Sequence, residues 1–152
     1  MKKILVVIVL LLLTGCTNKV EEDKYAYLEY KNNLEEQKDF VSQESLEFNT
    51  YFNLVRETEE KVTYSLVIDS PKVNMNNVKA LLIHDFVTDD VFPSVGIFDE
   101  PVTLHKDSND KIVLEGSIQT IDDISDTKFK LYLEYVDDDG LENNIYYEVH
   151  RG

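Results

Sequence analysis

The chain has 152 residues, which is enough for one ordinary domain with a short appendage. Hydrophobic residues make up 43% of it, a fraction that allows a packed core and argues against wholesale disorder. Its 30 acidic residues outnumber 15 basic ones, for a formal net charge of −15, and this makes nucleic acid a poor partner because phosphate binding needs a basic surface.

The N-terminus has the layout of an export signal. Lys2 and Lys3 precede an unbroken apolar run at residues 4–13. A helix that spans a bilayer needs about 20 residues, so this run is too short for a permanent span. A short positive segment, an apolar stretch and then small residues are typical of a secretory signal peptide.

The apolar run ends in Leu13-Thr14-Gly15-Cys16, which contains the only cysteine of the chain. This segment resembles the lipobox of bacterial lipoproteins, in which an aliphatic residue, a small residue and Gly or Ala precede the cysteine. The resemblance implies that Cys16 carries a diacylglyceryl group on its sulfur, and that the signal is cut between Gly15 and Cys16. Two or more acyl chains on one residue would hold a soluble domain on the extracytoplasmic face of the cell membrane. The alternative is an ordinary signal peptide with an incidental cysteine.

Residues 17–43 are highly charged and contain neither Pro nor Gly. Val20, Tyr27, Leu34 and Val41 recur at seven-residue steps, which is the spacing of one apolar stripe on a helix. The pattern predicts an amphipathic helix of about 15–20 residues. Packing on its own domain or a partly ordered spacer is favoured over a coiled coil or a partner-binding helix, although the stripe alone does not distinguish these cases.

From Leu46 onward the apolar period changes to two, which predicts β-strands. We expect seven, at residues 46–54, 62–69, 77–86, 102–105, 111–119, 128–136 and 144–150. The third is apolar on both faces, as expected of a strand that is buried on both sides. The segment at 106–110 predicts a hairpin between the fourth and fifth strands, and the Asp-Gly pair at 139–140 predicts one between the last two.

Seven short strands in about 105 residues are typical of sandwich folds. The predicted fold is therefore mainly β: a seven-stranded immunoglobulin-like or fibronectin-III-like β-sandwich preceded by an N-terminal amphipathic helix. The predicted organisation is a signal peptide at 1–15, a lipidated N-terminus and helical segment at 16–44, and the sandwich at 45–152. Because no second cysteine exists, an internal disulfide is excluded and the core alone must hold the domain.

The stretch IHDFVTDDVFPSVGIFDEPVTL, residues 83–104, is similar to a pattern in small uncharacterised lipoproteins of low-GC Gram-positive bacteria. The shared features are an Ile-His pair, an acidic step, and then Phe-Pro-Ser, a hydrophobic residue and Gly-Ile-Phe-Asp. The resemblance covers most of the mature domain and implies its localisation and fold, but no activity.

The same stretch supplies a candidate partner-binding loop. Its residues are Phe92, Pro93, Val95, Ile97 and Phe98. If they were exposed together, they would mark an interaction site. The favoured alternative is a crossover between strands whose apolar side chains fill the core, with Gly96 allowing a close backbone approach.

Signals for catalysis are weak. The chain has no G-x-S-x-G motif, and a lipidated Cys16 could not act as a nucleophile. His84, His105 and His150 each lie in or beside a predicted strand, outside any motif for metal binding or nucleophilic catalysis. Neighbouring carboxylates in sequence do not supply the separations that glycosidases need.

Calcium is the one cofactor that the acidic turns suggest. It takes about six to eight oxygen ligands from a compact loop. The candidate ligands are Asp137, Asp138 and Asp139 in one turn, and Asp107 and Asp110 in another. Neither turn matches the EF-hand pattern, and Asp and Asn also favour turns for backbone reasons alone.

Taken together, these features favour a membrane-anchored surface lipoprotein whose sandwich binds another envelope protein or a polymer without catalysing a reaction. A calcium-binding module is the alternative. A small-solute-binding lipoprotein is less favoured, because transport receptors usually need two lobes and a cleft. An enzyme is likewise a minority hypothesis.

Overall fold

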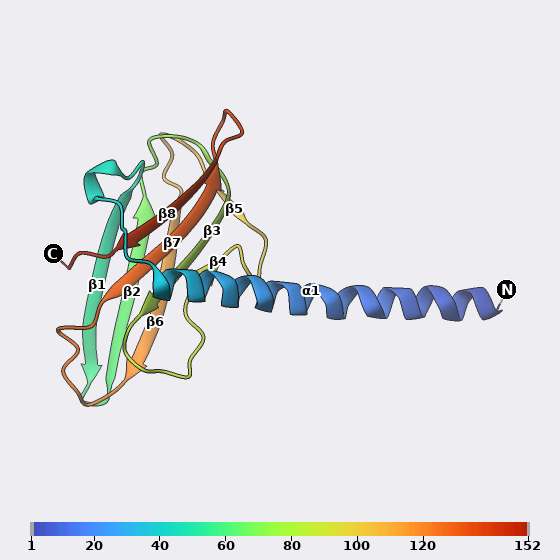
Figure 1. Cartoon of the computed structure of the whole chain (residues 1–152), viewed down its shortest axis with the longest axis horizontal. Coiled ribbons are helices and arrows are strands. Elements are labelled where there is room, and N and C mark those ends of the chain that lie inside the picture. The colour runs from blue at the N-terminus through green and yellow to red at the C-terminus, as the bar shows by residue number, and fades with distance from the viewer. Residues whose placement is uncertain (1, 152) are drawn as a thin grey trace.

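A computed structural model describes the chain from residue 2 to residue 151, with side chains described from residue 18 onward (Figure 1). In this part of the chain one α-helix precedes a 3₁₀ turn at Gln43–Ser45 and eight strands. The helix is α1 (Lys2–Glu36), and the strands are β1 (Asn49–Thr58), β2 (Lys61–Asp69), β3 (Met75–His84), β4 (Ser94–Val95), β5 (Val102–Leu104), β6 (Lys111–Gln119), β7 (Phe129–Val136) and β8 (Glu142–Glu148).

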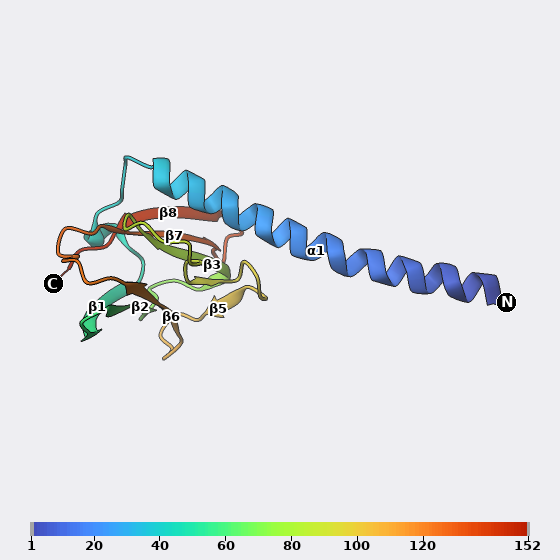
Figure 2. The ribbon, with the colours of Figure 1, turned by 90° about the horizontal axis from the view of Figure 1, so that it is seen from below.

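The strands form two antiparallel sheets. One has the order β1-β2-β6, and the other has the order β4-β3-β7-β8 with β5 also paired to β3. Figure 2 shows the two sheets as layers, with α1 lying on the outer side of the β3-β7-β8 layer. The chain is therefore mainly β and has a sandwich-like arrangement, with its single described helix on one face.

The core lies between the sheets and draws on both of them. Val62, Tyr64, Leu66 and Ile68 alternate along β2 as fully buried residues, which is the period-two pattern that a half-buried strand requires. They belong to one buried cluster with residues from the facing sheet, including Leu82, Leu131 and Leu133. Removing each such side chain from water contributes roughly 1.5–3 kcal/mol, so this cluster is the main source of stability.

A second apolar cluster lies between α1 and the outer face of the larger sheet. We call it the helix-docking cluster; its buried members are Tyr27, Leu34, Leu81, Ile83, Phe92, Ile97 and Tyr132. Strand β3 contributes Leu82 to the central core and Leu81 to the helix-docking cluster. The prediction of a strand buried on both faces is thus confirmed. One face of β3 packs in the central core, and the other is covered by α1.

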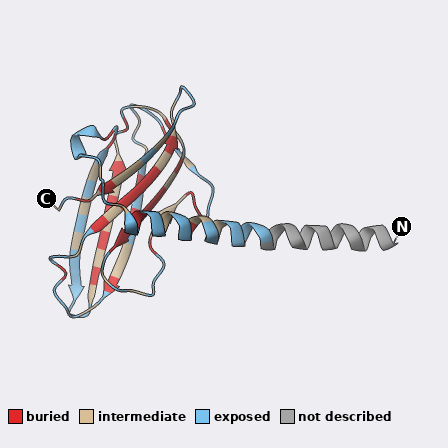
Figure 3. Ribbon diagram, in the orientation of Figure 1, coloured by how far each residue is buried: buried red, intermediate tan, exposed pale blue. Residues whose placement is uncertain are grey.

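The predicted apolar stripe of the helix is confirmed only at its centre. Tyr27 is 7% exposed and Leu34 is fully buried, whereas Val20 is 68% exposed and Val41 is 39% exposed. Val41 lies beyond the end of α1, and Figure 3 shows burial on the helix only where it crosses the sheet. The helix therefore packs on its own domain, which is one of the two favoured alternatives.

The seven predicted strands correspond to seven of the eight observed ones. The first begins at Asn49 rather than at residue 46, because Leu46 and Phe48 are buried in the core without belonging to the ladder. The segment 111–119 is matched in full by β6. Strand β4 was not predicted, since two residues carry no periodic signal.

The predicted hairpin between the fourth and fifth strands is wrong. Strand β5 pairs with β3, where Leu104 lies opposite Met75, and β6 pairs with β2 along its whole length. The segment that follows Leu104 therefore crosses from one sheet to the other. Its Asp, Ser and Asn residues favour a bend, but local turn chemistry does not decide which strand becomes the partner.

The predicted terminal hairpin is confirmed. Strands β7 and β8 pair from Val136 opposite Glu142 to Lys130 opposite Glu148. At the turn, Gly140 has φ of +79° and its N–H donates to the Asp137 carbonyl at 3.1 Å. Glycine suits this position because it adopts a positive φ without steric cost.

Candidate functional site

A groove with a volume of about 540 Å³ lies between α1 and the outer face of the β3-β7-β8 sheet. We call it the helix–sheet groove. Its polar and aromatic lining comes from Glu29, Tyr30 and Asn33 of α1, Asn77 and Lys79 of β3, Tyr132 and Glu134 of β7, and Glu142, Asn144 and Tyr146 of β8. Its size is in the range of small-molecule and cofactor sites, about 300–1,000 Å³.

A hydrogen-bonded network forms the floor of this groove. Lys79 Nζ lies 2.6 Å from Glu134 Oε1, and Tyr132 donates to Glu134 Oε2 at 2.5 Å. Lys79 Nζ is also 3.5 Å from the hydroxyl of Tyr30, so the network joins the sheet to the helix. Lys79 and Glu134 are directly paired across β3 and β7, and Glu134 is paired with Asn144 across β7 and β8. Register alone thus brings these side chains to one face.

The ionisation of the network is fixed by its partners. Burial alone would raise the pKa of Glu134, but hydrogen bonds from Lys79 and Tyr132 outweigh it and lower that pKa. Burial alone would lower the pKa of Lys79, but the Glu134 carboxylate outweighs it and raises that pKa. Burial raises the pKa of Tyr132, and its bond to Glu134 raises it further. At neutral pH the network therefore holds one ammonium, one carboxylate and a protonated phenol.

This arrangement suits binding better than catalysis. A lysine that stays protonated is a poor nucleophile, and a carboxylate that stays ionised is a poor general acid. Tyr30 stacks on Tyr132 with ring centroids 4.7 Å apart, and Tyr132 contacts Tyr146 at 5.3 Å. Tyrosine rings beside amide and carboxylate groups provide apolar faces together with hydrogen-bonding edges for a ligand.

A bulge in β3 shapes one wall of the groove. The register of β3 against β7 shifts between Asn76 and Lys79, and Asn77 at the shift has φ of +53°. Asparagine is among the few residues that tolerate this conformation. Bulges of this kind redirect side chains and are over-represented beside functional sites.

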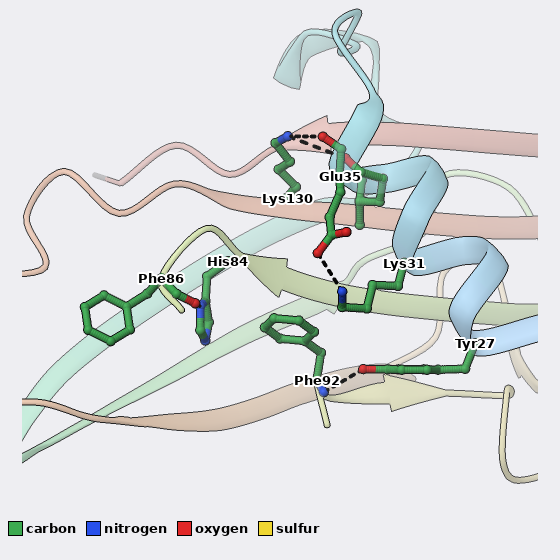
Figure 4. A network of polar contacts seen from close by, with 8 residues as sticks. Tyr27, Lys31, Glu35, His84, Phe86, Phe92 and Lys130 are labelled. Carbon is green, nitrogen blue, oxygen red and sulfur yellow. Dashed lines mark hydrogen bonds and ion pairs between the residues drawn. The ribbon is translucent and has the colours of Figure 1, made fainter. Parts of the chain in front are cut away.

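The candidate partner loop contacts the chain's own helix. Phe92 and Ile97 are 6% and 5% exposed and belong to the helix-docking cluster. The Phe92 N–H donates to the Tyr27 hydroxyl at 2.9 Å, as Figure 4 shows. Phe98 keeps 49% of its surface exposed, and its ring lies 5.2 Å from that of Tyr27.

The remaining residues of that loop are tied into the larger sheet. Val95 pairs with Ala80 as part of β4, and the Pro93 carbonyl accepts a hydrogen bond from the Leu82 N–H at 3.1 Å. A Cβ on Gly96 would lie 2.4 Å from the Val78 carbonyl oxygen, so the expected close backbone approach at this glycine is confirmed. Phe98 is the candidate loop residue that presents most surface to an outside partner.

In the turn between β7 and β8, the acidic side chains bond to their own surroundings. Asp137 Oδ1 accepts from the N–H groups of Asp139 and Leu141, at 3.0 and 2.9 Å. Asp138 Oδ2 accepts from Asn74 at 2.9 Å. These bonds account for Asp137 as a turn former and link Asp138 to the segment before β3.

In the turn after β5, the Asp110 side chain also forms hydrogen bonds within its own turn. Asp110 Oδ2 accepts from the backbone N–H of His105 at 3.0 Å and lies 2.7 Å from its ring nitrogen Nδ1. These bonds and one to Ser108 hold the pKa of Asp110 down to about 2. Asp107 has φ of +60°, and it is exposed. Across residues with described side chains, no group of three or more His, Cys, Asp or Glu is arranged to hold a metal ion.

The three histidines have different surroundings. His84 is 5% exposed and lies between the rings of Tyr64 and Phe92. His105 is exposed and pairs with Asp110, and His150 is exposed at the end of the chain. Burial of His84 lowers its pKa, so this ring is neutral at pH 7.

Leu13, Thr14, Gly15 and Cys16 lie outside the residues whose side chains are described, so lipidation and cleavage there stay predictions. Over the described residues, no helix has the length and apolar character needed to cross a bilayer. Comparisons with protein-family models, with curated proteins and with solved structures found no match to this chain.

Proposed function

We propose that the chain is a lipoprotein held on the extracytoplasmic face of the membrane through Cys16, and that its β domain is a non-enzymatic module that binds an envelope protein or polymer. The observation that supports this proposal is the packing of α1 on the β domain. Helix α1, whose range includes the lipobox residues, buries Tyr27 and Leu34 against the outer sheet face. An anchor at its N-terminal end would therefore fix the orientation of the domain.

The spacing supports this arrangement. A helix rises about 1.5 Å per residue, so Asn18 and Tyr27 stand about 14 Å apart along the axis. That length keeps the first buried contact away from the lipid headgroups. A strongly acidic domain benefits from such a distance, because an anionic membrane surface repels it.

The helix–sheet groove is the proposed binding surface. Lys79 and Glu134 compensate each other, which leaves Glu29 and Glu142 as the uncompensated charges along the lining. A ligand with neutral or cationic groups is therefore favoured over an anionic one. The stacked rings of Tyr30 and Tyr132 provide the apolar contact.

We also assign the sandwich to the fibronectin-III-like type. If β1, β2, β3, β6, β7 and β8 are taken as strands A, B, C, E, F and G, the two sheets have the orders A-B-E and C-F-G. This partition is the one shared by immunoglobulin-like sandwiches. The strand order is what supports the assignment.

The anchor is tested by the intact mass of the protein purified from its native membrane with detergent. We expect a chain that starts at Cys16 and carries added acyl mass, and a Cys16→Ala variant that is unprocessed or released from the membrane. A native chain without lipid contradicts the proposed anchor.

The groove is tested separately, by sedimentation of the detergent-purified full chain with isolated cell envelopes. The double variant Asn33→Ala/Asn144→Ala removes two exposed amides of the groove. Asn53→Ala, an exposed strand asparagine on the other sheet, is the control. We expect the double variant alone to reduce the bound fraction; equal binding of all three proteins contradicts the assignment.

A further inference from the structure

A second cavity, of about 410 Å³, lies at one end of the sandwich, between the smaller sheet and the segment that follows β3. It is separate from the helix–sheet groove and shares no lining residue with it. We propose that this cavity, lined by Tyr64, His84, Asp90, Phe92, Gly116 and Gln119, binds a neutral, hydroxyl-rich small molecule of monosaccharide size. The proposal does not depend on lipidation or on the function of the groove.

Two almost fully buried polar side chains meet in this cavity from opposite sheets. Tyr64 of β2 is 3% exposed and His84 of β3 is 5% exposed. Their rings contact edge to face, with centroids 5.3 Å apart and an interplanar angle of 89°. Polar groups buried this deeply are normally hydrogen-bonded, so a group without a protein partner points to water or a ligand.

The tautomer of His84 follows from its one bonded nitrogen. Nδ1 lies 3.1 Å from the Phe86 carbonyl oxygen, which can only accept, so Nδ1 carries the proton. Because burial lowers the pKa of this ring, Nε2 is unprotonated at pH 7 and is an acceptor. Figure 4 shows Nε2 on the side of the ring away from Phe86.

The hydroxyl of Tyr64 is placed by a glycine. Tyr64 lies directly opposite Gly116 in the β2–β6 ladder. A Cβ at position 116 would lie 2.3 Å from Tyr64 Oη, so only glycine lets the phenol lie across β6 at the cavity wall. Glycine in the middle of a strand weakens it and often marks such a close approach. Burial raises the pKa of Tyr64, so its hydroxyl remains a donor.

Within the described part of the chain, neither Tyr64 Oη nor His84 Nε2 has a hydrogen-bond partner, and neither is sealed off from solvent. The lining of the cavity thus presents both a donor and an acceptor. A hydroxyl group is the simplest group that satisfies both, because it accepts from the phenol and donates to the imidazole. A ligand that displaces water from both groups must itself be polar, because an apolar occupant would leave both unpaired.

The rest of the lining selects for charge and shape. The rings of Phe92 and Tyr64 provide an apolar wall, against which the C–H face of a sugar ring can pack. The amide of Gln119 and the hydroxyls of Thr88 and Ser117 supply further hydrogen-bonding groups. Asp90 is the one charged residue in this lining, and its carboxylate disfavours anionic ligands.

Isothermal titration of the full chain, in a detergent without a sugar headgroup, tests the proposal. The probes are glucose, galactose, ribose and N-acetylglucosamine, with glucuronate as the anionic counterpart of glucose. We expect saturable binding of at least one neutral sugar, and binding of glucuronate at least about tenfold weaker than the best of them. Failure of all four neutral sugars to bind, or equal binding of glucuronate, overturns the proposal.

Two tyrosine variants locate the site. Tyr64→Phe keeps the ring and removes only the hydroxyl, and we expect it to weaken binding about threefold to tenfold. Tyr147→Phe makes the same change at a buried core tyrosine that does not line the cavity, and should leave binding unchanged. If both variants bind like the unaltered chain, or both lose affinity equally, the sugar is bound elsewhere and the proposal fails.

Discussion

Lys130 Nζ lies 3.2 Å from the carbonyl oxygen of Glu35, so a strand residue of the larger sheet caps the C-terminal end of α1 (Figure 4). The same ammonium lies 3.5 Å from the Leu34 carbonyl. The last carbonyls of a helix have no partners within it and carry partial negative charge, so a cation there is stabilising. The contact joins residues 95 positions apart in sequence.

Replacing Lys130 with glutamine should therefore loosen the helix. We expect Lys130→Gln to lower the free energy of unfolding by about 1 kcal/mol and to speed amide hydrogen exchange in the last turns of α1. Denaturant unfolding and exchange measurements check this. The control is Lys128→Gln, since Lys128 is 60% exposed and 3.8 Å from Glu148, and such surface pairs contribute little. Equal effects in both variants would contradict the conclusion that Lys130 caps α1.

The apolar part of the same contact predicts a larger effect. Leu34 of α1 is fully buried against the sheet, whereas Leu28 on the same helix is 43% exposed. Leu34→Ala should cost about 2–5 kcal/mol of unfolding free energy, and Leu28→Ala should stay within about 0.5 kcal/mol. Urea unfolding of both variants measures the difference. A small loss at Leu34 would mean that the helix contributes little to the stability of the domain.

Two glycines with similar backbone angles should respond differently to alanine. Gly96 has φ of +72° and Gly140 has φ of +79°, so alanine is strained at both. At Gly96 the new Cβ would also meet the Val78 carbonyl oxygen at 2.4 Å, whereas at Gly140 nothing lies within 4 Å. We expect Gly140→Ala to cost about 1 kcal/mol and Gly96→Ala clearly more. Equal thermal shifts would show that the loop at Gly96 adjusts freely.

Burial of His84 predicts a pH dependence. Its pKa in the folded chain is lowered from the ordinary 6.5, so the unfolded chain binds the proton more readily. The stability that comes with a neutral His84 is present above pH 6.5 and is lost as the pH falls through its folded pKa. Unfolding free energies measured from pH 8 down to pH 5 should therefore decline less steeply in His84→Gln than in the unaltered chain. His150→Gln, at an exposed histidine, should keep the original slope.

Calcium should leave the thermal midpoint unchanged. The oxygens of Asp137 and Asp110 already accept hydrogen bonds within their own turns. Thermal unfolding with calcium and with a chelator compares the two conditions directly. A midpoint that rises with calcium concentration would instead support the alternative of a calcium-binding module.

The elements that the sequence predicts well are those whose signal is local. Alternation places β6 at its full length, and the Asp-Gly pair places the turn between β7 and β8. The wrong hairpin after β5 depended on pairing, which is long-range: Leu104 finds Met75 rather than the next strand along the chain. Val20 fits the helical stripe by spacing, but it is 68% exposed, because periodicity does not show how far the covering surface extends.

The candidate site shows the same division. The sequence marks Phe92 and Ile97 as apolar loop residues, but it does not show that α1 covers them. The network of Lys79, Glu134 and Tyr132 was missed. Its one sequence signal is a charged residue within an otherwise apolar strand, as at Lys79 and Glu134. The register that brings these residues together with Tyr132 is seen only in the folded sheet.

The position of α1 also has a mechanical consequence. In a chain tethered at its N-terminal end, a pull on the domain enters along the axis of α1 and acts as shear across the contacts that Tyr27 and Leu34 make with the sheet. Shear must break these contacts together rather than one after another. The load would reach β1, an edge strand paired with β2 alone, only after the helix had slid free and the hydrogen bond from Val41 N–H to the Tyr146 carbonyl had broken. In a chain tethered in this way, the helix would protect the start of the β domain from force.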